Sequence, residues 1–377
     1  MKLIKDIIWD LLVFLLPKVP TDDKRFLIFL VHPRDRDDIY KKMPFLKKMP
    51  DFVLSLFERY MWPVTVSKIN HKKTGEIYGF MISIPSTAKT MMYNRSLAKK
   101  KIKQALKLGY KKGGRIAALG ALTASLTYGG KDVYDGTINI TTGHAYTVIN
   151  IKNIFKESLR VLNANPEQVK VAIVGAAGSI GSGSAKLFCK DGVKDFLLVD
   201  LERKKEQLER LASELSEKHR DLDIKISSNL SDLRDRDVIV AATNHPDALI
   251  KKEHLSQRAV VIIDDAQPSD LDPAIFDMDN VLALEGGASK TKNITANFPF
   301  GLCHKDDNYS CMAEGILLLL NSSEDKAHLG PLTDEHIDFI SKLSDKYGFR
   351  PAEFQNYKES CIANKKIKKV LSFSRFQ

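Results

Sequence analysis

The sequence has few cysteines and no long apolar run, and each of these features excludes some classes of protein. Its four cysteines, Cys189, Cys303, Cys311 and Cys361, form no C-x-x-C pair, and no His/Cys cluster has the spacing of zinc ligands. We therefore expect no metal site, and we expect free thiols in a reducing compartment. Internal repeats and low-complexity linkers are also missing, and 44% hydrophobic with 28% charged residues is typical of a soluble globular protein.

The apolar stretch at the N-terminus, residues 1–16, is interrupted by Asp10 and closed by Pro17. It is too short and too charged to span a membrane, and it lacks the small-residue cleavage site of a secretory signal. Two interpretations remain open: a helix that lies in a membrane interface, or a terminal helix docked on the protein. We expect a cytoplasmic protein, with peripheral membrane contact left open.

The net charge of +11 predicts an acidic partner, such as nucleic acid, anionic lipid, a phosphorylated cofactor or an acidic carrier protein. Residues 95–115 hold nine cations and no acid, with apolar residues at helical spacing, which predicts a basic helix. We interpret Lys99, Lys100 and Lys103 as a dock for a carrier protein or for the phosphates of coenzyme A; the alternative is a solvated helix face. Nucleic acid is not expected, because no aromatic platform or DNA-reading motif accompanies the lysines.

A chain of 377 residues favours two domains. Strands and helices alternate from residue 169 to about residue 290, and this rhythm predicts an α/β fold, a Rossmann-type doubly wound parallel sheet with a second α/β substrate domain. We expect an apolar helix over 1–24, a substrate or acyl-binding domain over 25–165, a nucleotide-binding domain over 166–300 and a C-terminal helical segment with a basic tail over 301–377. Residues 163–166 are a candidate hinge.

A glycine-rich loop joins the predicted strand 169–174 to a helix that begins near Ser179. Gly175 permits the tight turn, Gly178 lets the backbone approach a pyrophosphate, and Gly181 allows the helix to pack against the strand. The pattern predicts a site for NADH or NADPH. Its expected contacts are Gly175, Ala176, Gly178, Ser179, Ile180, Gly181 and Thr243.

The end of the second strand points to both forms of the cofactor. Asp200 stands where an acid usually bonds the ribose 2′-hydroxyl of NAD, whereas Arg203 and Lys204 would clamp the 2′-phosphate of NADP. The choice between NAD and NADP stays open.

Seven segments in order carry a family resemblance. They are Ala118-Leu119-Gly120, Thr141-Thr142-Gly143, the glycine-rich loop, Ile263-Asp264 with Leu271-Asp272, Glu285-Gly286-Gly287, Ser310-Cys311-Met312-Ala313-Glu314 and Tyr347-Gly348-Phe349. From about Phe26 to Ala352 the chain resembles the long-chain fatty acyl–acyl carrier protein reductases of cyanobacteria. The resemblance implies reduction of an acyl thioester, carried by acyl carrier protein or coenzyme A, to an aldehyde.

The same resemblance implies that Cys311 is the acyl-accepting nucleophile, since that family uses the cysteine of its Cys-x-Ala-Glu segment. Thr142, Gly143 and His144 become candidates for the substrate site. Where the family reads Asn-Thr-His-Thr, this chain reads His144-Ala145-Tyr146-Thr147, so His144 and Tyr146 are alternative replacements for the family histidine.

The residues themselves agree with covalent catalysis. A thiolate that captures the acyl group would hold its carbonyl carbon beside the nicotinamide. Cys311 precedes the apolar run 316–320, so it lies near a predicted helix N-terminus, where amides lower a thiol pKa and stabilise an oxyanion. Cys303, flanked by His304 as a base, is the rival nucleophile.

Two other functions remain open. One is an oxidoreductase similar to shikimate or amino-acid dehydrogenases, without covalent catalysis. The other is a membrane-associated protein that senses a nucleotide and has no turnover.

Overall fold

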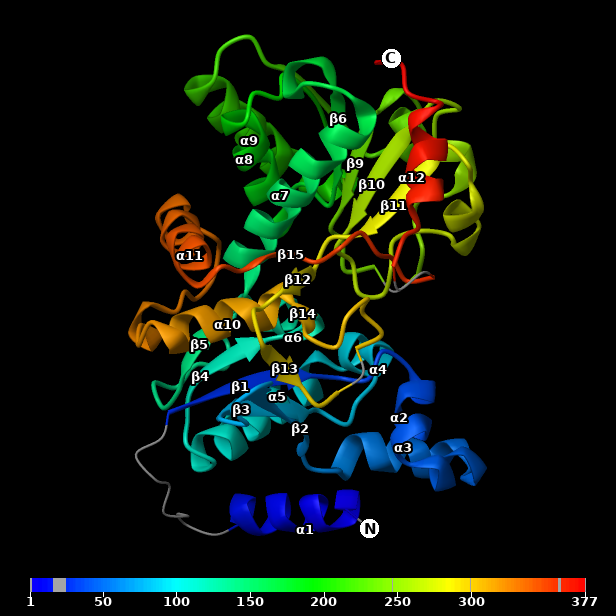
Figure 1. Cartoon of the computed structure of the whole chain (residues 1–377). Helices are drawn as coiled ribbons and strands as arrows, with labels where there is room; N and C mark the ends of the chain where they lie inside the picture. Colours follow the sequence, from blue (N-terminus) through cyan, green and yellow to red (C-terminus); the bar gives the residue numbers. More distant parts are fainter. Residues whose placement is uncertain (1, 16–24, 246, 299, 359–360, 377) are drawn as a thin grey trace.

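The computed structural model describes the chain except for residues 1, 16–24, 246, 299, 359–360 and 377, and it contains two stacked α/β units (Figure 1). The first unit is built on a six-stranded sheet in the order β13–β2–β3–β1–β4–β5. Four of its strands are parallel neighbours: β3 (Ile77–Ser83), β1 (Phe26–Val31), β4 (Gly114–Leu119) and β5 (Asn139–Thr141). At the other edge β2 (Val64–His71) is antiparallel to β3, and β13 (Ile294–Ala296) is antiparallel to β2.

The second unit is a parallel sheet in the order β11–β10–β9–β6–β7–β8. Its strands are β6 (Lys170–Val174), β7 (Asp195–Val199), β8 (Asp223–Ser227), β9 (Val238–Ala241), β10 (Val260–Asp264) and β11 (Val281–Glu285). Strand order reverses between β6 and β9, which creates the crevice where dinucleotides bind in this architecture. Helices α8 (Ser179–Lys190) and α9 (Lys205–Lys218) cover one face. The Rossmann-type doubly wound fold predicted from the strand rhythm is confirmed.

Alternate residues of β1 separate the two faces of the first sheet. Leu27 and Phe29 pack with α10 (Ser310–Leu320), while Ile28 and Leu30 pack with α5 (Arg95–Lys111). This is the two-residue period of a strand buried on both faces. Helix α5 therefore lies on the opposite face of the sheet from α10, which carries Cys311 (Figure 1).

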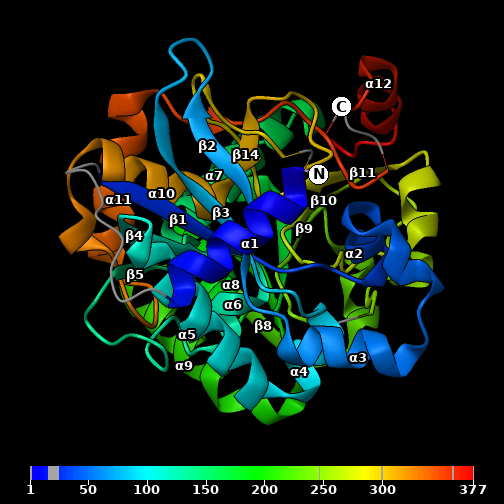
Figure 2. The ribbon, with the colours of Figure 1, turned by 90° about the horizontal axis from the view of Figure 1, so that it is seen from below.

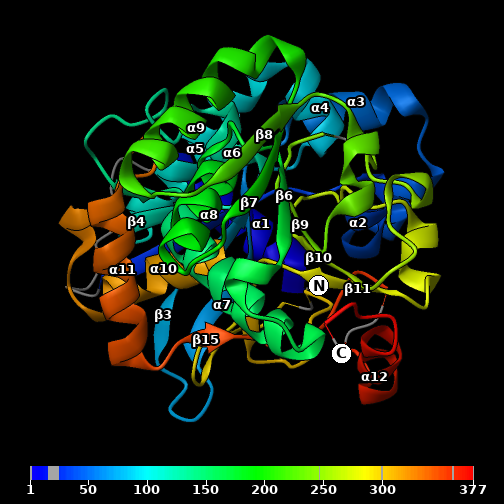
Figure 3. The same ribbon diagram turned by 90° about the horizontal axis from the view of Figure 1, so that it is seen from above.

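Helix α7 (His144–Leu162) belongs to both units. Tyr146 and Ile149 in its first half pack into the core of the first unit, and Ile154 and Phe155 in its second half pack into the core of the nucleotide-binding unit. A small antiparallel sheet of β12 (Ala288–Lys290), β14 (Asp307–Tyr309) and β15 (Arg350–Pro351) lies between the two large sheets (Figure 1). Its edge strand β15 contacts α7, beside which it lies in the view from above (Figure 3).

Two expected segment assignments differ from the structure. Residues 294–296, expected in the nucleotide-binding domain, form β13 of the first sheet because they pair with β2. The segment 301–377 is shared: α10 and α11 (Asp334–Tyr347) pack in the core of the first unit, whereas residues 364–371, expected as a basic tail, form α12 against α7 and β11.

The N-terminal helix α1 (Lys2–Leu15) is docked on the first unit. Asp10 and Val13 are buried on its inner side. The Asp10 carboxylate accepts hydrogen bonds from the Thr65 amide and hydroxyl, at 2.5 and 3.0 Å, and pairs with Lys112 Nζ at 2.6 Å. In the described residues no helix is long and apolar enough to cross a membrane.

The two termini do not form one surface. Helix α1 lies below the first sheet and α12 lies beside the second (Figure 1). The apolar helix α1 therefore packs on the first unit, whereas the basic helix α12 packs on α7 and β11.

The remaining helices of the first unit lie around the sheet. They are α2 (Arg36–Lys42), η1 (Pro44–Lys48), α3 (Asp51–Tyr60), α4 (Ala88–Tyr93) and α6 (Leu122–Leu126).

Replacing Asp10 with Ala should lower the free energy of unfolding by about 3 kcal/mol, because Lys112 would keep a mostly buried charge without its partner. Urea denaturation followed by circular dichroism measures this change. Lys5→Ala on the same helix removes an exposed side chain and should have little effect. Equal unfolding midpoints for the Asp10→Ala and Lys5→Ala proteins would contradict the docking role of Asp10.

Candidate active site

The glycine-rich loop has the backbone that close approach of a dinucleotide requires. Gly175 has φ +84°, and a Cβ there would collide with the Ala242 carbonyl. A Cβ at Gly181 would collide with the Gly175 carbonyl, so the first turn of α8 packs against the loop only because Gly181 has no side chain. Gly178 caps α8, and a Cβ added there would meet only the Gly175 carbonyl, at 3.2 Å, so its outer side is open at the helix N-terminus. The loop therefore fits a bound pyrophosphate.

The other predicted cofactor contacts, Asp200, Arg203 and Thr243, follow the carboxyl ends of β7 and β9. Asp200 at the end of β7 accepts a hydrogen bond from the Ala177 amide at 3.1 Å and pairs with Lys204 at 3.2 Å, while Arg203 is exposed. On the β9 side the Thr243 hydroxyl donates to Asp270 at 2.5 Å. Asp200, the candidate partner of a ribose 2′-hydroxyl, and Lys204, a candidate partner of a 2′-phosphate, thus neutralise each other in one ion pair.

One cavity of about 900 Å³ connects this crevice with the first unit. It contains Gly178, Ser179, Ile180 and Thr243 at the nucleotide end and Thr142, His144 and Cys311 in the middle. Its far end comes from the strands of the first sheet and from α2, α3 and the residues beside them, and it is lined mostly by apolar side chains, together with Arg34, Asp38 and Lys41. The apolar side chains include Phe29, Ile39, Met43, Phe57, Met61, Val64, Val66 and Met81. A predominantly apolar cavity with a few polar groups is typical of a ligand site.

Cys311 is the second residue of α10 and lies directly against the loop after β5. Gly143 in that loop has φ +74°, and a Cβ there would collide with the Cα of Cys311. The buried Glu314 carboxylate holds the two elements together by accepting hydrogen bonds from the Thr141 hydroxyl, the Tyr146 amide and His336. Burial alone would raise the pKa of Glu314, but these bonds lower it below its usual value, so Glu314 is a carboxylate.

Burial raises the pKa of the Cys311 thiol to about 12, and the nearby Asp265 adds to the shift. The backbone N–H groups of Met312, Cys311 and Ala121 act in the opposite direction and do not overcome burial. The sequence correctly predicted the position at a helix N-terminus, but the expectation of a lowered thiol pKa is wrong, because burial outweighs the helix amides.

Ala121 was not predicted as a site residue. It has φ +48°, a left-handed value that is unusual for alanine. Its N–H is one of the donors that act on the Cys311 sulfur. The adjacent Leu122 amide donates to Nε2 of His32, whose Nδ1–H donates to the Pro33 carbonyl. Burial lowers the pKa of His32, which agrees with a neutral ring that accepts at Nε2. No sequence signal identifies this turn beyond the Ala118-Leu119-Gly120 segment before it.

The structure places Tyr146 and His144, the two possible replacements for the family histidine, in different surroundings. Tyr146 is buried in the core, edge-on to Phe349 at 6.2 Å between ring centroids, and its hydroxyl has no hydrogen-bond partner among the described residues. His144 lines the cavity instead. Burial lowers the pKa of His144 to about 4, so the ring is neutral, and its buried Nδ1 has no partner among the described residues.

Acidic side chains at the carboxyl ends of β10 and β11 also line the cavity and were not given a role from the sequence. Asp265 and Glu285 face it, and Asp264 lies behind them. Burial raises the pKa of Asp265 to about 8, with a further contribution from Asp270, and raises that of Glu285 well above its usual range. The sequence signal that could have identified these acids is their position directly after buried parallel strands, because the carboxyl ends of those strands border the crevice.

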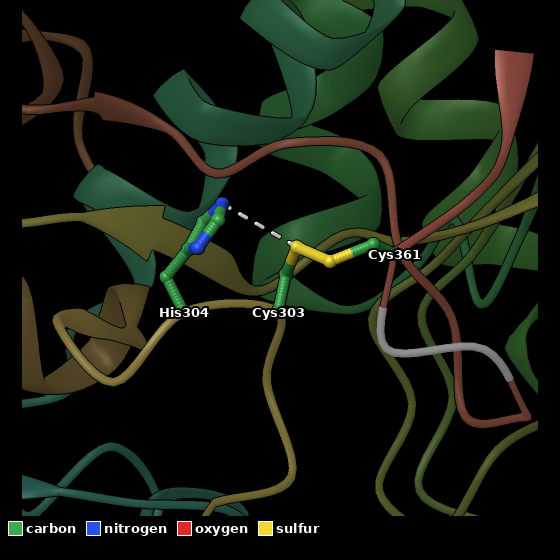
Figure 4. Close-up of side chains that lie close together, drawn as sticks. All are labelled: Cys303, His304 and Cys361. Carbon is green, nitrogen blue, oxygen red and sulfur yellow. Dashed lines mark hydrogen bonds between the residues drawn. A yellow bond between two sulfur atoms is a disulfide. The ribbon is translucent and has the colours of Figure 1, made fainter.

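Cys303 is not a rival nucleophile in this structure. It forms a disulfide with Cys361, and His304 Nε2 lies 3.5 Å from the Cys303 sulfur (Figure 4). The expectation of four free thiols is therefore wrong for Cys303 and Cys361. The two cysteines are 58 residues apart, and no sequence pattern indicates that they pair. Cys189 and Cys311 are free, and burial raises the pKa of Cys189 to about 12.

The basic helix α5 is less uniform than its sequence. Lys100 and Lys103 are exposed, but Lys99 pairs with Asp132 at 2.6 Å. Lys101 is buried and donates to the Met61 carbonyl at 2.6 Å, and burial lowers its pKa to about 8. Only part of the cluster is thus available to a partner, and it lies across the sheet from Cys311.

Comparison with known proteins gives a family match for part of the chain. Residues 157–285 match the shikimate/quinate 5-dehydrogenase family. The chain is 27% identical over 252 residues to the aminotransferase PigE of Serratia sp., which covers 66% of this chain and 29% of that protein. It is also 27% identical over 274 residues to the long-chain acyl-[acyl-carrier-protein] reductase of Synechococcus elongatus, covering 67% of this chain and 76% of the reductase.

Similar solved structures include a dehydrogenase and a malic enzyme. The L-tryptophan dehydrogenase of Nostoc punctiforme is 8% identical and has a TM-score of 0.38, covering 86% of this chain and 80% of the enzyme. The NAD-dependent malic enzyme of Thermotoga maritima is 14% identical and has a TM-score of 0.39, covering 94% of this chain and 84% of the enzyme.

The glycine-rich loop, its position at the switch point and the dehydrogenase family match agree with one another. The chain is an NAD(P)-dependent oxidoreductase. Its cofactor is NAD(H) or NADP(H), and the cavity that Cys311 lines also reaches the glycine-rich loop.

Gly178→Asp should weaken dinucleotide binding by at least about 100-fold, because a carboxylate would stand where the pyrophosphate approaches the helix N-terminus. Fluorescence titration with NADH and NADPH measures the affinity. Gly178→Ala is the matched control, since a Cβ there meets only the Gly175 carbonyl at 3.2 Å, and it should lose much less. If a folded Gly178→Asp protein binds dinucleotide normally, the loop is not the phosphate site.

Proposed function

We propose that the protein reduces a fatty acyl thioester to an aldehyde through an acyl intermediate on Cys311. The observation that carries the proposal is the position of Cys311 in one cavity, between an apolar end suited to an acyl chain and the nucleotide-binding loop. The weak similarity to an acyl-carrier-protein reductase supports the same reaction.

The first step transfers the acyl group to the chain. Cys311 Sγ bonds to the thioester carbonyl carbon, the bond from that carbon to the carrier sulfur breaks, and the carrier leaves as a thiol with the proton that Cys311 gives up. Because the Cys311 thiol is protonated at neutral pH, this step needs a base. His144 is the candidate base because it lines the same cavity and its Nδ1 has no partner among the described residues. Burial lowers its pKa to about 4 and so weakens it as a base, and no hydrogen bond joins it to Cys311 among the described residues, so the role requires the ring to approach the sulfur when substrate binds.

The second step reduces the acyl group. When bound at the loop, the reduced nicotinamide supplies a hydride. With a proton added to the oxygen, Cys311 then carries a hemithioacetal, whose carbon–sulfur bond breaks to release the aldehyde and restore the thiol. Asp265 fits as a proton source because its raised pKa, about 8, keeps much of it protonated near neutral pH. The N–H groups that point to the sulfur also favour its departure as a thiolate.

The carrier remains part of the proposal. Acyl carrier protein or coenzyme A would present the thioester, and the exposed Lys100 and Lys103 support an acidic carrier by accelerating its encounter with the first unit. The dehydrogenase alternative needs no acyl-enzyme, so detection of that species distinguishes the two reactions.

Cys311→Ser should bind dinucleotide normally, form no acyl adduct at neutral pH and make no aldehyde, because a hydroxyl is a far weaker nucleophile than a thiolate. Intact-mass analysis after mixing with an acyl thioester and no cofactor detects the adduct. Cys189→Ser, which removes the other free thiol, should still acylate. Aldehyde formation by Cys311→Ser at the wild-type rate would favour direct hydride transfer without a covalent intermediate.

The pH dependence of acylation tests His144. With its pKa near 4, His144 is neutral above about pH 5, so the wild-type rate should be nearly constant between pH 6 and 9. His144→Ala should slow acylation at pH 7 by about 100-fold or more. Its rate should then rise about tenfold per pH unit, because only the thiolate fraction would react and the Cys311 pKa lies near 12. Quenched single-turnover reactions read by mass spectrometry give both profiles, and a flat His144→Ala profile would exclude the base role.

A further inference from the structure

The underside of the first unit carries exposed apolar side chains on two neighbouring segments. Nine large side chains there are 41–69% exposed, and we call them the lower face. They are Ile8, Trp9, Leu12 and Leu15 of α1, and Phe45, Met49, Phe52, Leu56 and Tyr60 of η1, α3 and the residue after η1. In the view from below, α1 crosses the first unit nearest the viewer and α3 lies on the same side (Figure 2). Clusters of this kind mark interaction sites.

The two segments are connected. Trp62, two residues after α3, donates its indole N–H to the Ile7 carbonyl of α1 at 3.4 Å. The inner sides of the helices hold Asp10 on α1 and Leu54 on α3, both buried. Phe52, Leu56 and Tyr60 recur every four residues and so form a single stripe on the other side of α3.

The charge around the lower face is positive. Lys5, Lys47, Lys48 and Arg59 are exposed on the same three elements. Among the carboxylates whose side chains the structure describes there, Asp10 and Glu58 are buried and Asp51 pairs with Arg36 at 2.6 Å. Lys107 of the adjacent α5 lies over the Phe14 ring of α1, 5.4 Å from its centroid.

We infer that the lower face binds the surface of an anionic lipid bilayer. Apolar side chains that enter the acyl boundary, together with flanking cations, are the two signals that stable peripheral binding needs. Trp9 and Tyr60 are the residue types that favour the membrane–water interface. A second copy of the chain is a weaker fit, because the same exposed lysines and arginine on both copies would repel one another across a two-fold contact.

Helix α3 also separates the bilayer site from the cavity. Phe57 and the adjacent Met61 line the cavity that contains Cys311, whereas Leu56 and Tyr60 belong to the lower face. A bilayer on this face would lie one helix away from the apolar end of the cavity. A water-insoluble acyl chain would then have a short path from the bilayer to the cavity, and this consequence rests on the proposed function. The binding of the lower face to a bilayer does not rest on it.

Flotation of the full-length protein with vesicles tests the inference. The protein should float with vesicles of phosphatidylcholine and phosphatidylglycerol at low salt, and much less with phosphatidylcholine alone or at high salt. A variant with Trp9→Ser, Leu12→Ser, Phe52→Ser and Leu56→Ser should partition at least about tenfold less. The matched control, Tyr134→Ser with Phe373→Ser, removes exposed rings outside the lower face and should bind like the wild type.

A pair of charge variants tests the location. Lys47→Gln with Lys48→Gln should lower partition by about fivefold or more, whereas Lys365→Gln with Lys368→Gln, which removes two exposed cations from α12, should not. A larger loss from the α12 pair would overturn the inference. So would an absence of flotation for the wild type at low salt, or light scattering that shows a dimer which the four-serine variant converts to a monomer.

Trp9 gives a readout in a nearly native chain. The protein has two tryptophans, so in Trp62→Phe the only indole emission comes from Trp9. Binding should shift this emission to the blue, and lipids brominated on their acyl chains should quench it. Flotation without quenching would mean that the lower face stays in water and would contradict the inference. Because none of these measurements needs turnover, they succeed or fail independently of the acyl-reductase reaction.

Discussion

The site depends on the contact between the loop after β5 and the start of α10. Gly143 approaches the Cys311 backbone so closely that any side chain would collide, and Glu314 fixes that approach with three hydrogen bonds from separate elements. A buried carboxylate is stable only when its oxygens accept hydrogen bonds. The charge of Glu314 therefore favours the positions at which Thr141, Tyr146 and His336 donate to it. The same contact orients the first turn of α7, which begins with His144.

Local patterns in the sequence predicted much of the fold and part of the site. The parallel sheet and the backbone of the glycine-rich loop were predictable because each depends on neighbouring residues: the run 170–174 forms β6, and Gly175 adopts the left-handed turn. The basic helix was also predicted nearly to its ends, since α5 covers residues 95–111. The position of Cys311 at a helix N-terminus followed from the apolar run after it.

What the sequence could not provide depends on contacts between distant segments. Three residues of β13 add to an edge strand more than 220 positions earlier in the chain, and so short a strand has no periodicity of its own. The Cys303–Cys361 disulfide and the burial of Lys101 likewise follow from tertiary packing. The raised thiol pKa of Cys311 has the same origin, because desolvation by the surrounding protein outweighs the helix amides that local sequence does predict.

The packing of helix α7 limits how the two units can move relative to each other. The sequence suggested a hinge at residues 163–166, but that segment follows α7, whose second half is already packed in the nucleotide-binding core. Rotation at 163–166 would therefore leave both ends of the cavity where they are. Because one helix of nineteen residues is embedded in both cores, a relative movement of the two units requires side chains to slide along its surface. Such shear is small in amplitude, so the distance from the nucleotide loop to Cys311 is set largely by the length and packing of α7.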